Sequence, residues 1–214
     1  MSECNIDLQE KNQSYPRTCD RCGFGPCMKH NVSRRILNGT RGLYIGAMEK
    51  NREGGFKSRT HVVEALMSIG VTVWNHYNNP IRSDSDEGDA EMFERFEQWR
   101  EEENYEAIHE CGKPIRNKDL ALIDKCDFVI CELDMEKLSC GTWEELFLAN
   151  RHKKPVFVFC KQGKKAIPLW MWWTLPINYF YNNLEEVIDT LKKIDTGDIV
   201  IDNDRWKLLR PEFR

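Results

Sequence analysis

The chain has 214 residues, of which 41% are apolar and 31% charged, a composition typical of a soluble globular protein with one sizeable core. Its formal net charge of −4 argues against a general binder of nucleic-acid polymers or of acidic membranes. The sequence shows no export segment, so we expect a cytoplasmic protein whose cysteines are reduced or bound to metal. It also has no apolar run of bilayer length, so we expect no membrane partner.

The N-terminal extension is polar and holds four of the nine cysteines. Its spacing, Cys19-x2-Cys22-x4-Cys27-x2-His30, suits tetrahedral zinc, because glycine-rich turns can present thiolates and an imidazole to one ion. Cys4 is an alternative fourth ligand. We therefore expect a structural zinc clip, with a reduced, metal-free cluster or an iron–sulfur site as the alternatives.

Protein purified without chelator is expected to contain about one zinc per chain, because four ligands complete one tetrahedral site. Cys22→Ser should lose this zinc, whereas Cys111→Ser, which lies outside the cluster, should retain it. Inductively coupled plasma mass spectrometry measures both. A folded preparation without bound metal would contradict the zinc clip.

Strands and helices are predicted to alternate after the extension. Two strands are expected at residues 42–47 and 71–74, where short apolar runs end in small or polar residues. Between them, a polar loop at 48–57 precedes a helix that Ser58 caps. The apolar residues of that helix recur at helical spacing until Gly70 ends it.

The second half continues this pattern. Helices are expected at 91–110 and 117–125, and residues 126–160 then hold two apolar strands around a helix that begins at Gly141-Thr142, as in a right-handed β-α-β unit. An amphipathic helix follows at 184–194. The alternation predicts an α/β fold with a doubly wound parallel sheet, Rossmann-like or flavodoxin-like. We divide the chain into a small Cys-rich N-terminal extension (1–40), a catalytic domain (41–195) and a C-terminal tail (196–214).

Residues with catalytic chemistry gather at the carboxyl edge of this predicted sheet, where such folds bind ligands. Tyr44 lies near the end of the first strand, Asp119 lies in the helix before the third strand, and Glu145 lies in the first turns of the next helix. A carboxylate nucleophile held by a phenol, with a second carboxyl group as proton donor, suits displacement at an anomeric carbon. Each residue alone has a structural explanation, as a core tyrosine or a helix-start acid. Their joint occurrence indicates catalysis.

The motifs around these residues are Leu43-Tyr44-Ile45-Gly46-Ala47, Asn117-Lys118-Asp119-Leu120, and Gly141-Thr142-x-x-Glu145 followed by Ala149. In this order they resemble the nucleoside 2-deoxyribosyltransferase superfamily. The resemblance implies that Glu145 attacks C1′ and forms a covalent glycosyl ester, that Tyr44 orients it, and that Asp119 helps the base to leave. It also implies catalysis without a cofactor, and a homodimer in which a neighbour completes the pocket.

One position separates branches of this superfamily. Ser139 stands six residues before the nucleophile, where nucleoside transferases usually carry Asp. The branch that hydrolyses nucleoside 5′-monophosphates is similar to this chain here, because a hydroxyl at a helix N-terminus attracts a phosphate that an Asp would repel. The predicted substrate-binding residues are Ser139, Gly141, Thr142, Gly46, Arg52, Gly54, Gly55 and His76.

Hydrolysis of the N-glycosidic bond of a nucleoside 5′-monophosphate is therefore our first hypothesis. The alternatives are a 2-deoxyribosyltransferase that exchanges bases, a non-catalytic nucleotide sensor, and an NAD-cleaving enzyme. Base exchange would identify the transferase, and binding without turnover would identify the sensor. Cys140 lies beside the site but has no His close in sequence, so we do not expect it to be the nucleophile.

Overall fold

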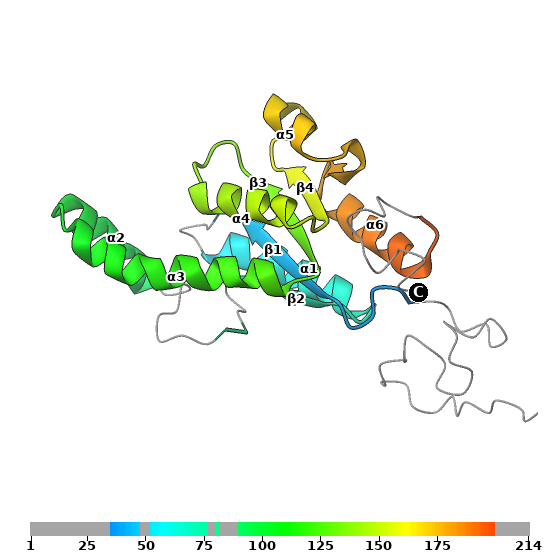
Figure 1. Cartoon of the computed structure of the whole chain (residues 1–214), viewed down its shortest axis with the longest axis horizontal. Helices are drawn as coiled ribbons and strands as arrows, with labels where there is room; N and C mark the ends of the chain where they lie inside the picture. The colour runs from blue at the N-terminus through cyan, green and yellow to red at the C-terminus, as the bar shows by residue number, and fades with distance from the viewer. Residues whose placement is uncertain (1–34, 48–51, 77–79, 82–89, 200–214) are drawn as a thin grey trace, which may run out of the picture.

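The computed structural model describes most of the predicted catalytic domain (Figure 1). The described residues are 35–47, 52–76, 80–81 and 90–199. Outside them lie most of the C-terminal tail and the four predicted zinc ligands, Cys19, Cys22, Cys27 and His30, so the zinc clip stays a prediction.

The described residues form one five-stranded parallel sheet. Its strands are β1 (Arg41–Gly46), β2 (Thr72–Trp74), β3 (Phe128–Leu133), β4 (Val156–Cys160) and β5 (Phe180–Tyr181). They lie in the order β2-β1-β3-β4-β5, which is the flavodoxin-like order, so the predicted doubly wound fold is confirmed. The sequence did not predict β5, because two residues are too few to show a period.

Helices cover both faces of this sheet. They are α1 (Arg52–Met67), α2 (Ala90–Glu101), α3 (Tyr105–Lys125), α4 (Cys140–Arg151), α5 (Leu169–Thr174) and α6 (Leu184–Thr196), with 3-10 turns η2 (Lys164–Ala166) and η3 (Ile177–Tyr179). In Figure 1, α3 and α4 cross in front of the strands, whereas α1 lies behind them and packs against α6. The helices fall on two faces because each crossover between parallel strands is right-handed. From β1 to β2 the chain moves toward one edge of the sheet, and from β3 to β4 it moves toward the other edge, so α1 and α4 lie on opposite faces. Among the described residues, no helix is both long and apolar enough to span a membrane.

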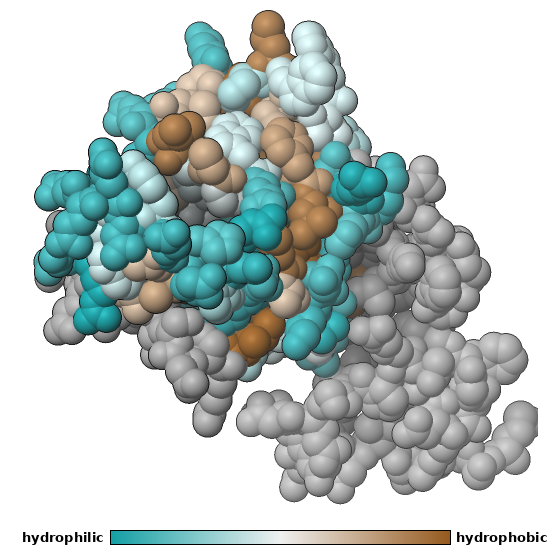
Figure 2. All heavy atoms as spheres, turned by 60° about the vertical axis from the view of Figure 1, so that its left-hand side comes forward, coloured by the Kyte–Doolittle hydropathy of each residue, from teal (hydrophilic) through white to brown (hydrophobic). Residues whose placement is uncertain are grey.

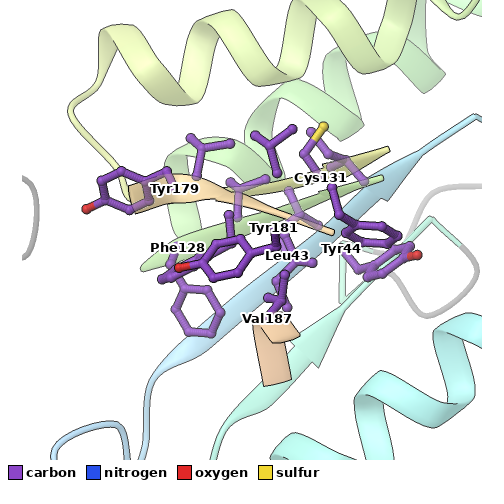
Figure 3. Packing of buried hydrophobic residues seen from close by; sticks show 14 of the residues in the cluster. Leu43, Tyr44, Phe128, Cys131, Tyr179, Tyr181 and Val187 are labelled. Carbon is purple, nitrogen blue, oxygen red and sulfur yellow. The ribbon is translucent and has the colours of Figure 1, made fainter. Parts of the chain in front are cut away.

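The centre of the core is formed by β3 and β4, whose residues are all buried. Strands that are covered on both faces carry nearly continuous apolar residues, which is why these two were the clearest in the sequence. Phe157 of β4 packs against the rings of Phe128, Tyr179 and Tyr181, which Figure 3 shows in the same cluster as Tyr44. In β3 a single charged residue, Glu132, interrupts the apolar run.

The first helix begins earlier than predicted. It starts at Arg52 rather than at Ser58, so Gly54 and Gly55 lie in its first turns and not in a loop. Arg, Glu and Lys are strong helix formers, and each Gly costs a helix only about 1 kcal/mol, so two glycines near its start did not end it.

Two helices precede the third strand, as predicted, but the break between them lies earlier in the chain than the predicted break at 111–116. The chain breaks after α2, where Glu103 has a φ of 54° and the side chain of Asn104 caps α3. α3 then continues through Pro114, whose exposed position lets water bond the carbonyl that a proline leaves free. Asp119 therefore lies in the second half of one long helix rather than near the start of a short one.

Candidate active site

Three buried or nearly buried side chains meet at the carboxyl edge of the sheet, each from a different part of the chain. His76 follows β2, Asp119 comes from α3 and Glu145 from α4. His76 Nδ1 lies 3.2 Å from Oδ1 of Asp119, and His76 Nε2 lies 3.6 Å from Oε1 of Glu145. The structure thus brings together three of the predicted site residues, with the imidazole between the two carboxyl groups.

The helical period of α4 explains why Glu145 points into this site. Glu145 shares its buried face with Thr142, Leu146 and Ala149, which follow one another at spacings of about one turn. Glu144 is one residue earlier, about 100° around the helix. It points outward and accepts two hydrogen bonds from Arg116 of α3. Adjacent glutamates therefore have different environments, and only the second lies in the site.

Burial gives Glu145 an unusual ionisation. The pKa of Glu145 is raised from 4.5 to about 7. Desolvation by burial is the largest cause, the carboxylates of Asp119 and Glu144 also raise the pKa, and His76 and Arg59 partly offset these effects. Glu145 is thus a buried carboxyl group with a pKa near neutrality, and its Oε1 accepts no hydrogen bond from the described residues.

Glu145→Gln is expected to stabilise the fold at alkaline pH. Folding raises the pKa of Glu145, so the folded state binds the proton more tightly than the unfolded chain. The resulting stabilisation is complete below the unfolded pKa of 4.5 and is lost as the pH rises through about 7. Above pH 7 the buried charge then costs about 3 kcal/mol, which a neutral amide of the same shape avoids. Urea unfolding at pH 8 should show this gain, and at pH 4.5 the gain should shrink.

The matched control is Glu144→Gln, the same chemical change one residue earlier. Glu144 lies at the surface in an ion pair with Arg116, and such pairs contribute little to stability. We expect no stabilisation in this variant. Equal effects of the two substitutions at pH 8 would mean that burial does not penalise the charge of Glu145.

Tyr44 has a different partner from the expected one. Its hydroxyl donates a hydrogen bond to Glu132, not to Glu145. Tyr44 pairs with Ile130 across β1 and β3, so Glu132, two residues further on, lies on the same face of the sheet. Glu145 comes from α4, which covers the opposite face. The predicted contact between Tyr44 and the nucleophile is therefore absent from this structure.

The N-terminus of α4 lies where the sequence predicted a phosphate site. Ser139 precedes the helix without capping it, and its hydroxyl instead lies 2.7 Å from that of Thr142. A Cβ built on Gly141 would have no neighbour within 4 Å, so space is open over the first turn. The first N–H groups of a helix without such a cap are available to an anion.

The other predicted binding residues lie at the end of β1 and the start of α1. Arg52, Gly54 and Gly55 belong to the first turns of α1, and the side chain of Arg52 lies outside what the structure describes. Gly46 ends β1 opposite Glu132, and a Cβ there would lie 3.2 Å from the Cβ of Glu132. A side chain at position 46 would thus crowd Glu132, and a glycine avoids this close contact between the two strands.

Three charged residues near the site were not predicted from the sequence: Arg59, Glu132 and Lys161. Arg59 of α1 is buried, stacks over the Tyr44 ring at 5.6 Å and donates to the carbonyl of Gly46 at 3.4 Å. Lys161 follows β4, and its Nζ lies 3.0 Å from Oε1 of Glu132. Two signals were present: Glu132 is a charge inside an apolar strand, and Arg59 lies one turn before Val62 on the inward stripe of its helix.

The three residues that meet at the site could also hold a metal ion. The nearest donor atoms of His76, Asp119 and Glu145 all lie within 4.8 Å of one another, and one imidazole with two carboxylates suits a divalent transition metal. A cation held there would occupy the oxygens of Glu145 and so exclude a sugar from them.

Comparison with known proteins places the chain in a family. A family model described as nucleoside 2-deoxyribosyltransferase matches residues 43–202, a range that includes Tyr44, Asp119, Ser139 and Glu145. A search of curated proteins gives no match.

Two solved structures are similar to the chain. One is a 2-deoxyribosyltransferase from the psychrotolerant bacterium Bacillus psychrosaccharolyticus, with 21% identity over 70% of this chain and 95% of that one, at a TM-score of 0.46. The other is the CMP N-glycosidase BcmB of Clostridium botulinum, with 16% identity over 71% of this chain and 98% of that one, at a TM-score of 0.42.

Proposed function

Because the chain belongs to the nucleoside 2-deoxyribosyltransferase family of enzymes, we propose that it hydrolyses the N-glycosidic bond of a nucleoside 5′-monophosphate. The products are the free base and (deoxy)ribose 5-phosphate. The observation that carries this proposal is Glu145, a buried carboxyl group with a pKa of about 7 and an oxygen that no described donor bonds. Such a carboxylate is suited to attack an anomeric carbon.

In the first step, an oxygen of Glu145 forms a bond to C1′ while the bond from C1′ to the base breaks. The electron pair of that bond passes to the base, and Asp119 donates the proton that the departing base requires. His76 lies between the two carboxyl groups and orients Asp119 through their 3.2 Å contact. This step yields the free base and a glycosyl ester of Glu145.

In the second step, water attacks C1′ from the face that the base has left. The Asp119 carboxylate takes a proton from the water, and the ester bond breaks to restore Glu145. Two displacements at C1′ retain its configuration. No cofactor takes part in either step.

The preference for a 5′-phosphate rests on the start of α4. Ser139 stands where an Asp would repel a phosphate, and the open N-terminus of α4 offers N–H groups to an anion. α1 follows β1 and α4 follows β3, and these two strands are neighbours in the sheet. The chain crosses to opposite sides of the sheet after these strands, so the positive N-terminal ends of the two helices flank this switch point. Arg52, the first residue of α1, stays a predicted phosphate-binding residue.

The second candidate is base exchange, which the family description itself favours. Both reactions share the glycosyl ester of Glu145, and they differ in whether water or a second base attacks it. Chromatographic detection of free base from a panel of nucleosides and their 5′-monophosphates separates them. Release from monophosphates without an added base supports hydrolysis. Release from nucleosides only when an acceptor base is present supports the transferase.

Two other outcomes of the panel would overturn the proposal. Binding of nucleotides without release of any base would indicate the nucleotide sensor. Release of nicotinamide from NAD, with no reaction of the monophosphates, would indicate the NAD-cleaving enzyme.

The proposed enzyme works as a homodimer. Four large apolar side chains are exposed at α5 and η3: Leu169 (72%), Trp170 (66%), Trp173 (74%) and Ile177 (80%). Figure 2 shows hydrophobic and pale, near-neutral side chains at the top of the molecule, the level at which α5 lies in Figure 1. A cluster of this kind is typical of a surface that another protein covers.

Trp170→Glu is expected to convert the dimer into a monomer, because it would bury a charge in the interface. Met67→Glu is the matched control: Met67 on α1 is equally exposed, at 66%, but lies outside the apolar cluster. Size-exclusion chromatography with light scattering measures the mass of both. A monomeric wild-type protein, or a dimer that survives Trp170→Glu, would contradict this interface.

A further inference from the structure

The turn that leads from β3 to α4 is tied to the turn that follows β4. Gln162, the second residue after β4, forms this link with both ends of its side-chain amide. Its Nε2 donates to Oδ1 of Asp134 at 2.8 Å, and its Oε1 accepts from the N–H of Met135 at 3.0 Å. Oε1 also accepts from the thiol of Cys160 at 3.3 Å. One side chain thus joins the ends of two neighbouring strands.

Asp134 is the centre of this link, because both of its carboxyl oxygens have partners. It is buried where β3 ends, and its Oδ1 also accepts from the N–H of Glu136 at 3.1 Å. The ammonium groups of Lys161 and Lys137 lie 3.7 and 3.8 Å from its Oδ2. Desolvation raises the pKa of Asp134, but the hydrogen bonds and the two ammonium groups outweigh it and lower the pKa below its usual value. Gln162 therefore donates to a carboxylate, and such a bond is stronger than one between neutral groups.

The link fixes the backbone directly before the predicted phosphate site. The N–H groups of residues 135–137 all donate to Gln162 or Asp134. A single residue, Leu138, separates this turn from Ser139, and it is 91% exposed, so the core does not hold it. The position of Ser139 therefore depends on this turn on one side and on α4 on the other.

We infer that Gln162 is a positioning residue that holds the turn at 134–137 and so presents Ser139 to the 5′-phosphate of the substrate. A turn that is already ordered does not have to be ordered when the phosphate binds, which lowers the cost of binding. The effect on substrate choice rests on the proposed function, whereas the link itself does not. None of the motifs around Tyr44, Asp119 and Glu145 contains Gln162.

Gln162→Met tests the effect on substrate choice, because it removes both hydrogen-bonding ends of the side chain and keeps its length. KM for the most active monophosphate should rise about 10-fold with less than about a twofold change in kcat, because a phosphate remote from C1′ is bound alike in the ground state and the transition state. The matching nucleoside has no phosphate, so its kcat/KM should not change. The preference for the monophosphate, as the ratio of the two kcat/KM values, should thus fall about 10-fold. A loss of folded enzyme cannot produce this result, because it lowers both values equally.

A second variant and a control make the kinetic test specific. Gln162→Glu keeps the acceptor oxygen but turns a carboxylate oxygen toward Asp134 in place of the N–H donor, so it should also lower the preference. Lys154→Met is the control, because Lys154 forms a similar link at the opposite edge of the sheet, where its Nζ donates to the carbonyls of Asp124 and Cys126. Its preference should match that of the wild type. A wild-type preference in both Gln162 variants, or an equal loss in Lys154→Met, would overturn the positioning role.

The link can also be tested without any substrate, by hydrogen exchange in the full-length protein. The N–H groups of Met135 and Glu136 should exchange slowly in the wild type, because side-chain oxygens accept them. The N–H of Met135 should exchange at least about tenfold faster in Gln162→Met and at the wild-type rate in Lys154→Met. Equal exchange in the wild type and in Gln162→Met would overturn the inference. A wild type with no preference for monophosphates would overturn the proposed phosphate site, while the exchange rates would still decide whether Gln162 holds the turn.

Discussion

Glu145→Gln is expected to reduce base release by more than about 10⁴-fold, the scale on which enzymes lose rate when a covalent nucleophile is removed. The amide keeps the size of the side chain and its place beside His76, so the pocket should still bind substrate. The loss therefore appears in kcat rather than in KM. Steady-state kinetics on the most active monophosphate of the panel measures it.

The same site should reveal its covalent intermediate. Wild-type protein quenched during turnover should gain the mass of one sugar phosphate on the peptide that contains Glu145, and Glu145→Gln should not. Glu144→Gln is the control, because Glu144 pairs with Arg116 outside the site and should retain most of the activity. Retention of activity in Glu145→Gln, with loss in Glu144→Gln, would refute Glu145 as nucleophile.

Asp119→Asn is expected to lower kcat by about 10²- to 10⁴-fold, the usual contribution of a general acid–base. An asparagine can still lie beside His76, but it cannot give a proton to the departing base or take one from water. The defect should depend on the leaving group. A sugar phosphate with a phenolic leaving group that departs without a proton should recover most of the first step, seen as a burst of released phenol.

The control for this substitution is Asp124→Asn, on the same helix. Asp124 is exposed and lies 3.3 Å from His152 at the far end of α3, so its amide variant should behave as wild type. If Asp119→Asn slowed the phenolic substrate and the natural one equally in the first step, Asp119 would be a structural residue and not the acid.

The family match confirms what the motifs predicted, and the parallel sheet confirms the predicted fold. Apolar runs such as those of β3 and β4 can be recognised locally, because a strand buried on both faces has few polar residues. His76 and Glu145 could be predicted as site residues for a similar reason. His76 follows the carboxyl end of β2, and Glu145 lies near the start of α4, which follows β3, so the parallel topology brings both to the same edge. Asp119 lies in the second half of α3, and only its motif predicted it.

The partners of these residues came only from the tertiary structure. The spacing of residues in a sequence gives the period of one strand or one helix, but not which groups meet across the sheet. Tyr44 and Glu132 are 88 positions apart and meet because the register of β1 and β3 puts them on one face. The pKa of Glu145 likewise depends on burial by surrounding elements and on charges from α1, α3 and the end of β2. Local patterns thus determined the elements and the residues at their ends, and through-space contacts decided which hydroxyl, carboxylate and cation act on one another.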